Sequence, residues 1–228
     1  KTDLNGTVVW VRDFADWKTE RPQYWPILPT DAVVVPGTDL LLVADGYGSS
    51  FVHGLNKNTG EYVEGSTFGG KGGTIQPLRF NTPHGISLDP RVRAPAGSPA
   101  HAPVFVVSDR SNERLVWVLA NGEFVASAPM RDRGPGMALP CNVDTHVDPD
   151  AGPVAVVPSL GTSLSDLTGA SVGIFNGSNA LLSTIAVADL IGDLGHQHPH
   201  DAIFLPNGDL VVCCWSGPGN PGQGPAKG

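Results

Sequence analysis

The sequence is short of positive charge and lacks long apolar runs, and each shortage excludes a class of protein. Its 14 Lys and Arg are outnumbered by 22 Asp and Glu, and no basic run is present, so nucleic-acid binding is not expected. No stretch of about 18 apolar residues is present either, so we expect no membrane span. A signal peptide is not visible, although trimming of the N-terminus would have removed one.

Cysteine is also scarce. The three cysteines, Cys141, Cys213 and Cys214, are too few for a disulfide framework, and the neighbouring pair on a strand would point to opposite faces. A disulfide between Cys141 and one of that pair stays open. Glycosylation sequons begin at Asn5 and Asn176, and although such triplets also arise by chance, they favour a secreted or extracellular glycoprotein.

A third absence is helical periodicity. No window has apolar residues at the i, i+3, i+4, i+7 spacing of a long amphipathic helix. Instead, 29 Gly, 21 Pro and only 16% charged residues favour many turns between short apolar runs. Turn signals at 58–60, 120–122 and 206–208 separate such runs, which is typical of β-hairpins. The composition therefore predicts an all-β protein.

A short sequence motif that begins with proline occurs four times. It reads Pro-His-Gly-Ile from Pro83, Pro-His-Asp-Ala from Pro199, Pro-Thr-Asp-Ala from Pro29 and Pro-Cys-Asn-Val from Pro140. The steps between these prolines are 54, 57 and 59 residues, and such a period marks a propeller or another repeat array. Each repeat holds several short apolar runs, so we expect one repeat to form one four-stranded antiparallel blade of a β-propeller.

The repeat frame predicts a single propeller domain over residues 1–228. We expect the tail of a blade at 1–28 with a strand at 7–11, whole blades at about 29–82, 83–139 and 140–198, and a partial blade at 199–228. Closed propellers have about four to eight blades, so this interpretation takes the chain as a segment of a longer one. The open ends expose sheet edges, which a protein partner could cover.

Two histidines occupy equivalent places in this frame. In a propeller the first strand of each blade lines the central channel, so His84 and His200 are expected to converge on the axis as a candidate zinc site. Thr30 and Cys141 hold the other two equivalent places, whereas a catalytic zinc usually takes three protein ligands. The alternative is that each histidine merely begins its inner strand.

The remaining histidines carry less information. Alternation along an extended strand would place His196 and His198 on the same face as His200, either as an extra ligand or as a base in the channel. His53 lies in the context of a turn or an outer strand, and we expect its side chain to be solvated.

Four strings carry a resemblance to a known family. They are Val-Ala-Asp-Gly-Tyr at 43–47, Gly-Gly-Lys-Gly at 69–72, Phe-Asn-Thr-Pro-His-Gly-Ile at 80–86, and Val-Ser-Asp-Arg-Ser-Asn-Glu-Arg-Leu at 107–115. The chain resembles NHL-repeat β-propellers, and within them it is most similar to peptidyl-α-hydroxyglycine α-amidating lyase and its bacterial relatives. The resemblance is close over residues 29–125, moderate over 196–215, and elsewhere limited to the repeat frame. It implies a six-bladed propeller of NHL type, of which about four blades are represented here.

The family splits a peptidyl-α-hydroxyglycine into a peptide amide and glyoxylate. It uses a catalytic Zn²⁺ held by three histidines and a nearby structural Ca²⁺. The resemblance implies that His84 and His200 are two of the zinc ligands, and that the third precedes Lys1. It also places Asp201 among the calcium ligands, which suits a hard cation that prefers oxygen.

The resemblance assigns two catalytic residues as well. It implies that Tyr47 is the base for the substrate hydroxyl and that Arg110 pairs with the substrate carboxylate, for which a guanidinium fork is suited. A second substrate arginine would precede Lys1. The chain departs from the family at His198, where an apolar residue is common, and around 141–144, which puts the substrate in question more than the fold.

Three functions are compatible with these residues. The first is a secreted, zinc-dependent carbon–nitrogen lyase that acts on a small-molecule or peptide substrate. The second is a non-catalytic NHL propeller that acts as an extracellular binding or scaffold module. The third is a calcium-dependent lactonase, which carboxylates and Asn at the channel mouth would favour, whereas histidines with Tyr47 favour the lyase.

Overall fold

The computed structural model describes residues 1–150, 152–162, 169–187, 189 and 197–216. Its strands are β1 (Asp31–Val34), β2 (Leu40–Ala44), β3 (Phe51–Asn56), β4 (Phe68–Gly69), β5 (Pro83–Leu88), β6 (Val104–Asp109), β7 (Arg114–Leu119), β8 (Phe124–Pro129), β9 (Asp144–Asp148), β10 (Gly152–Ser159), β11 (Ser171–Phe175), β12 (Leu181–Ala186), β13 (Gln197–Phe204) and β14 (Leu210–Ser216). Helical elements among these residues are α1 (Trp17–Glu20), η1 (Pro22–Tyr24), η2 (Arg110–Asn112) and η3 (Arg131–Arg133). No described helix is long and apolar enough to cross a membrane.

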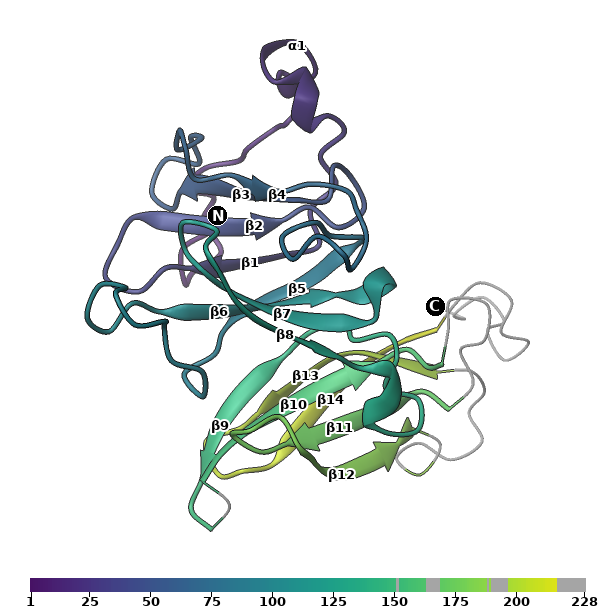
Figure 1. Cartoon of the computed structure of the whole chain (residues 1–228). Helices are drawn as coiled ribbons and strands as arrows, with labels where there is room; N and C mark the ends of the chain where they lie inside the picture. Colours follow the sequence, from purple (N-terminus) through teal and green to yellow (C-terminus); the bar gives the residue numbers. More distant parts are fainter. Residues whose placement is uncertain (151, 163–168, 188, 190–196, 217–228) are drawn as a thin grey trace.

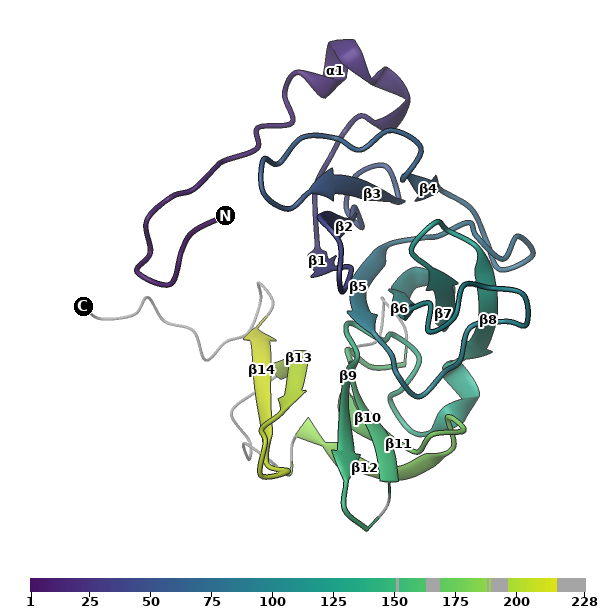
Figure 2. The same ribbon diagram turned by 90° about the vertical axis from the view of Figure 1, so that its left-hand side faces the viewer.

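The strands pair with their neighbours in the chain. β1–β4, β5–β8 and β9–β12 each form a four-stranded antiparallel sheet, and β13 pairs with β14 in a two-stranded one. The sheets follow one another along the chain (Figure 1), and β1, β5, β9 and β13 face a common centre (Figure 2). These first strands contact one another in turn: β1 with β5, β5 with β9, and β9 with β13. The predicted all-β propeller is confirmed.

The predicted turn signals connect strands as expected. Gly60, Gly122 and Gly208 have φ of 76°, 82° and 87°, a region that glycine enters without steric cost. In each case the preceding residues end one strand, and the chain then reverses into the next extended segment. The backbone dihedrals at these three glycines are therefore those of the turns that the sequence predicted.

Neighbouring sheets pack face to face through apolar clusters. Leu42 and Val52 of the first sheet lie in one buried cluster with Phe105 of the second, and Trp117 of the second lies in another with Ala155 of the third. A fully buried side chain of this size contributes about 1.5–3 kcal/mol of transfer free energy. This packing holds the inner strands, and the side chains they carry, at fixed spacing around the centre.

Carboxylates also tie one inner strand to the next. Asp31 Oδ2 on β1 accepts a hydrogen bond from the backbone N–H of Ile86 on β5 at 2.9 Å. Asp144 Oδ2 on β9 does the same for the N–H of Phe204 on β13 at 2.8 Å. Because each bond joins first strands of adjacent sheets, it fixes the height of one strand against its neighbour along the channel.

One glycine on an inner strand is required by the next sheet. A Cβ added to Gly85 would lie 2.6 Å from both the carbonyl oxygen of Cys141 and Oδ1 of Asn142. We expect Gly85→Ala to lower the free energy of unfolding by about 1–3 kcal/mol, because backbone would have to shift. Urea denaturation measures the change. Gly73→Ala is the control, since nothing lies within 4 Å of its added Cβ; equal losses would contradict the close-contact explanation.

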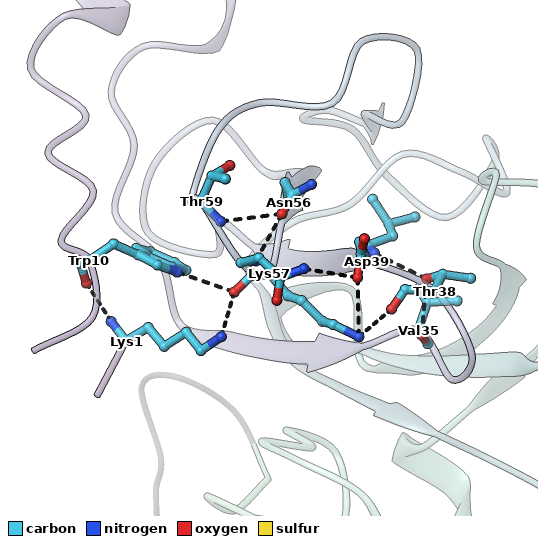
Figure 3. Close-up of polar contacts among 10 residues, drawn as sticks. Lys1, Trp10, Val35, Thr38, Asp39, Asn56, Lys57 and Thr59 are labelled. Atoms are coloured by element: carbon cyan, nitrogen blue, oxygen red, sulfur yellow. Dashed lines mark hydrogen bonds and ion pairs between the residues drawn. The ribbon is translucent and has the colours of Figure 1, made fainter. Parts of the chain in front are cut away.

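The strand predicted at 7–11 is wrong. Only an isolated bridge between Thr2 and Val8 forms there, and the segment is not part of a sheet. Trp10 Nε1 and Lys1 Nζ each donate to the carbonyl oxygen of Lys57 at 3.1 Å, which holds the segment against the turn after β3 (Figure 3). Lys57 Nζ in turn donates to the carbonyl of Thr38 at 2.5 Å. A β pattern forms a strand only where a neighbouring strand accepts its backbone hydrogen bonds.

Candidate functional site

His84 and His200 both lie in β-bulges. The register of β5 against β6 shifts between Pro83 and Gly85, and the register of β13 against β14 shifts between Pro199 and Asp201. Each histidine is therefore the extra residue of its strand, and a bulge redirects the side chain it carries. The two imidazole ring centroids lie 4.5 Å apart with the rings nearly perpendicular, so the predicted convergence is present in the structure.

Tyr47 and Arg110 reach the same place from the ends of second strands. Tyr47 lies in the turn that follows β2, and Arg110 begins η2 directly after β6. Tyr47 Oη is 3.1 Å from His84 Nε2, and Arg110 Nη1 donates to Tyr47 Oη at 3.2 Å. The guanidinium carbon also lies 5.3 Å from the centre of the Tyr47 ring. Four of the five predicted site residues thus form one contact group.

The hydrogen bonds assign the protons in this group. His84 Nδ1 lies 3.1 Å from the carbonyl oxygen of Cys141, which can only accept, so Nδ1 carries the proton. His84 Nε2 is then the acceptor, and the Tyr47 hydroxyl donates to it. Holding Nδ1–H on a backbone carbonyl is a common way to fix the tautomer and the ring orientation of a metal-binding histidine.

Arg110 is buried without a counterion in the described part of the chain. Arg110 is only 7% exposed, and its Nε has no hydrogen-bond partner among the described residues. None of the ion pairs found among described residues includes its guanidinium. Burying an unpaired charge costs several kcal/mol, on the order of 3–5. An anionic ligand at this position would offset that cost.

The electrostatics keep both imidazoles neutral. Burial, and then the positive charge of Arg110 and the neighbouring His200, lower the pKa of His84 to about 3, against a smaller opposite effect of the Cys141 carbonyl. Burial and Arg110 also lower the pKa of His200, against the charge of Asp201. Neutral imidazole is the form that ligates metal ions.

Cys141, at the place equivalent to the two histidines, differs in character. Burial raises the pKa of its thiol to about 11, although Arg110 acts in the opposite direction, so the thiol stays protonated. All three cysteines are free, which excludes in this structure the disulfide that the sequence left open. The contribution of Cys141 to the site is its backbone carbonyl.

The donors fit zinc only in part. His84 and His200 supply two neutral imidazoles of the type that zinc prefers. Within residues 1–150, 152–162, 169–187, 189 and 197–216, however, no group of three or more His, Cys, Asp or Glu side chains is placed to hold a metal ion. Since a catalytic zinc usually takes three protein ligands, these residues would fill two positions and leave the third to another part of the protein.

Asp201 directly follows His200 on β13. Its Oδ1 accepts hydrogen bonds at 2.9 Å from Asn142 Nδ2 and from the N–H of Ala202. Burial and the negative charge of Asp201 raise the pKa of Asp31, against backbone hydrogen bonds that lower it. Asp31 and Asn142 line a cavity of about 390 Å³. The calcium role of Asp201 stays a prediction.

Two other histidine expectations have different outcomes. His196 lies outside the described residues, whereas His198 is buried beside Trp215, with ring centroids 5.8 Å apart. The expectation that His53 is solvated is wrong, because His53 is only 1% exposed. Trp17 and Tyr24, from α1 and η1, pack on its ring and cover it. The sequence of residues 51–56 contains no pattern that would have predicted this cover, because the covering residues come from the distant N-terminal segment.

Comparison with known proteins finds structures of similar fold but does not assign the chain to a family. No protein-family model and no curated protein matches the chain. Among solved structures, the hydrazine synthase of Kuenenia stuttgartiensis is similar with a TM-score of 0.52 at 16% identity. The aligned part covers 82% of this chain and 43% of the synthase chain. A protein of unknown function from Bacteroides caccae has a TM-score of 0.53 at 16% identity, covering 94% of this chain and 62% of its own. The WD40 domain of Neurospora crassa Pan2 has a TM-score of 0.45 at 7% identity, covering 86% and 46%.

Similarity at this identity shows the fold alone. The chain spans less than two thirds of the length of each of these structures. The activity therefore has to be argued from the side chains of the site.

Proposed function

We propose that the protein is a metal-dependent carbon–nitrogen lyase resembling peptidylamidoglycolate lyase, which cleaves a peptidyl-α-hydroxyglycine to a peptide amide and glyoxylate. The observation that carries the proposal is the contact of the Tyr47 hydroxyl with both His84 and the buried guanidinium of Arg110. A substrate whose carboxylate and hydroxyl lie on adjacent atoms would meet an anion-binding group and a proton acceptor side by side.

The residues divide the chemistry between them. Arg110 binds the substrate carboxylate, since this charge is buried without a carboxylate partner among the described residues. In its phenolate form, beside the Arg110 guanidinium, Tyr47 Oη takes the proton of the substrate hydroxyl, and the electrons of the O–H bond form the carbonyl of glyoxylate. The carbon–nitrogen bond breaks with its electron pair on nitrogen, which takes up the proton now on Tyr47 and leaves as the peptide amide, so that Tyr47 returns to the phenolate.

Metal ions complete the proposal. His84 and His200 would hold a zinc ion, which when bound would polarise the substrate hydroxyl. The carbonyl of Cys141 holds the proton on His84 Nδ1, so Nε2 keeps a lone pair, which zinc would take over from the Tyr47 hydroxyl. Asp201 would contribute a carboxylate to a structural calcium. The NHL type, six blades in the complete propeller, and a third histidine from another blade belong to the same proposal.

Secretion is part of the proposal as well. It is supported by the sequon asparagines, since Asn5 is exposed in a turn and Asn176, which is half-buried, directly follows β11 at the start of a turn. Turns of this kind are accessible to glycosylation.

The direct test is glyoxylate release from a peptide that ends in α-hydroxyglycine, using full-length, zinc-supplemented protein. Release that depends on added zinc and is lost in His84→Ala supports the lyase. No release from folded, zinc-containing protein overturns it and favours the alternative, a non-catalytic propeller that serves as an extracellular binding or scaffold module.

Arg110→Ala separates carboxylate binding from chemistry. We expect KM to rise about 10- to 100-fold, since a hydrogen-bonded charge contributes roughly 1.5–3 kcal/mol. The matched control is a substrate whose terminal carboxylate is replaced by a carboxamide, for which wild type and variant should differ little. Equal losses for both substrates would show that Arg110 does not read the carboxylate.

A further inference from the structure

The two candidate catalytic residues are presented by the same structural device. Asp45 follows β2 and stands two residues before Tyr47, and Asp109 ends β6 directly before Arg110. Both aspartates are fully buried. We name each of them, with the groups that donate hydrogen bonds to it, a carboxylate clamp.

The first clamp gathers three segments on one carboxylate. Asp45 Oδ1 accepts the N–H of Leu28, just before β1, at 2.5 Å. Asp45 Oδ2 accepts the N–H and the hydroxyl of Ser49, at 2.7 and 2.5 Å. His53 Nε2 on β3 lies 3.3 Å from the Ser49 hydroxyl oxygen, which accepts its proton, and 3.6 Å from the same Oδ2. The turn that carries Tyr47 is thus held between the entry of β1 and the middle of β3.

The second clamp repeats this plan with different side chains. Asp109 Oδ1 accepts the N–H of Asn81, just before β5, at 2.7 Å, and Oδ2 accepts Arg114 Nε of β7, also at 2.7 Å. The third sheet has Ser159 in place of the aspartate, and its hydroxyl accepts the N–H of Leu139 at 3.0 Å. Leu160, which follows Ser159, is apolar and packs in a buried cluster with Leu139 and Cys141.

His53 therefore holds the place in the first clamp that Arg114 holds in the second, but it reaches the carboxylate through the Ser49 hydroxyl. Its ring is immobilised by Trp17, Tyr24 and Phe51, with ring centroids 5.2, 5.3 and 6.0 Å away. The turn itself has little room to move, since a Cβ on Gly48 would lie 2.4 Å from Asp45 Oδ1. A fixed donor on β3 and a tight turn leave Asp45 one position.

We propose that His53 is a positioning residue that, through the Ser49 hydroxyl and Asp45, holds the Tyr47 hydroxyl at His84 and Arg110. The role of Tyr47 in catalysis rests on the proposed function, but its placement by the clamp does not. His53 touches neither substrate nor the reacting atoms; it acts by donating its Nε2 proton to Ser49 Oγ at 3.3 Å, and the Ser49 hydroxyl in turn donates to Asp45 Oδ2. A side chain that donates from the same position should replace it, and an apolar one should not.

The structural test is ¹⁹F NMR of protein labelled with 3-fluorotyrosine, in which Tyr47→Phe assigns the Tyr47 line. Wild type and His53→Gln, which keeps a donor, should give the same Tyr47 line. His53→Leu should shift or broaden it. Ser159→Ala, which breaks the corresponding bond of the third sheet, should leave the line unchanged. An unmoved line in His53→Leu, or equal shifts in His53→Gln and His53→Leu, overturns the proposal.

Two further measurements keep the test decisive. If His53→Leu does not fold, Ser49→Ala removes the hydroxyl that links His53 Nε2 to Asp45 Oδ2, and the same comparison of the Tyr47 line applies. With substrate, His53→Leu should lower kcat at least 10-fold with KM changed less than 3-fold, and His53→Gln should restore kcat, as expected for a roughly 1 Å misplacement of a catalytic group. If wild type releases no glyoxylate, the proposed function fails while the NMR arm still decides the positioning role.

Discussion

Replacing Tyr47 by phenylalanine is expected to lower kcat for glyoxylate release by about 10²- to 10⁴-fold, the usual contribution of a positioned proton acceptor. The change removes only the hydroxyl, which is the atom that contacts His84 Nε2 and Arg110 Nη1. The ring can stay beside the guanidinium, so carboxylate binding and KM should change little. Steady-state kinetics with a peptidyl-α-hydroxyglycine measures both constants.

Tyr62→Phe is the matched control for this experiment. Tyr62 also loses a phenol hydroxyl, but its ring packs with Trp17 and under the guanidinium of Arg21, away from the contact group. Its kcat should stay within about twofold of wild type, because it touches no atom that reacts. A kcat of Tyr47→Phe that equals wild type would remove Tyr47 from the mechanism, whatever the activity of the protein.

The largest effect on stability is expected for Asp109→Ala. The variant leaves Arg114, which is 5% exposed, buried without its carboxylate partner at 2.7 Å. Removing one member of a buried ion pair costs about 3–5 kcal/mol, and we expect a loss of that size in the free energy of unfolding. Urea denaturation with a two-state analysis measures it.

An exposed ion pair provides the contrast. Glu113 and Arg131 also pair, but the Arg131 side chain is 56% exposed, so Glu113→Ala should cost about 1 kcal/mol or less. Arg114 also donates to the carbonyl oxygen of Arg79 at 2.7 Å. A loss below about 1 kcal/mol in Asp109→Ala would mean that such carbonyls alone satisfy the guanidinium.

The repeat is the part of the fold that local sequence information predicts well. The spacing of the four prolines and the alternation of short apolar runs with Gly-containing turns depend on residues close together in the chain, and the hairpins follow from them. The segment 7–11 has the same composition but forms no strand, because its partner would have to be a distant strand edge. Strand formation depends on a partner as much as on propensity.

The site divides in the same way. The equivalence of His84 and His200 follows from counting along the repeat, and the resemblance to the lyase family points to Tyr47 and Arg110. The burial of His53 under Trp17 does not follow from either, since these residues are distant in the chain and share no pattern. The bulges that redirect both histidines are equally invisible, because one extra residue in a strand leaves no signature in its composition.

By itself, then, the sequence determined an all-β repeat of antiparallel sheets and which residues occupy equivalent places in it, because turn chemistry and side-chain alternation are local properties. Only the tertiary structure decided that the Tyr47 hydroxyl meets His84 and Arg110, that Arg110 lacks a carboxylate partner among the described residues, and that both imidazoles are neutral. Those properties depend on burial and on distances between side chains from different sheets, which exist only after the sheets have packed around one centre.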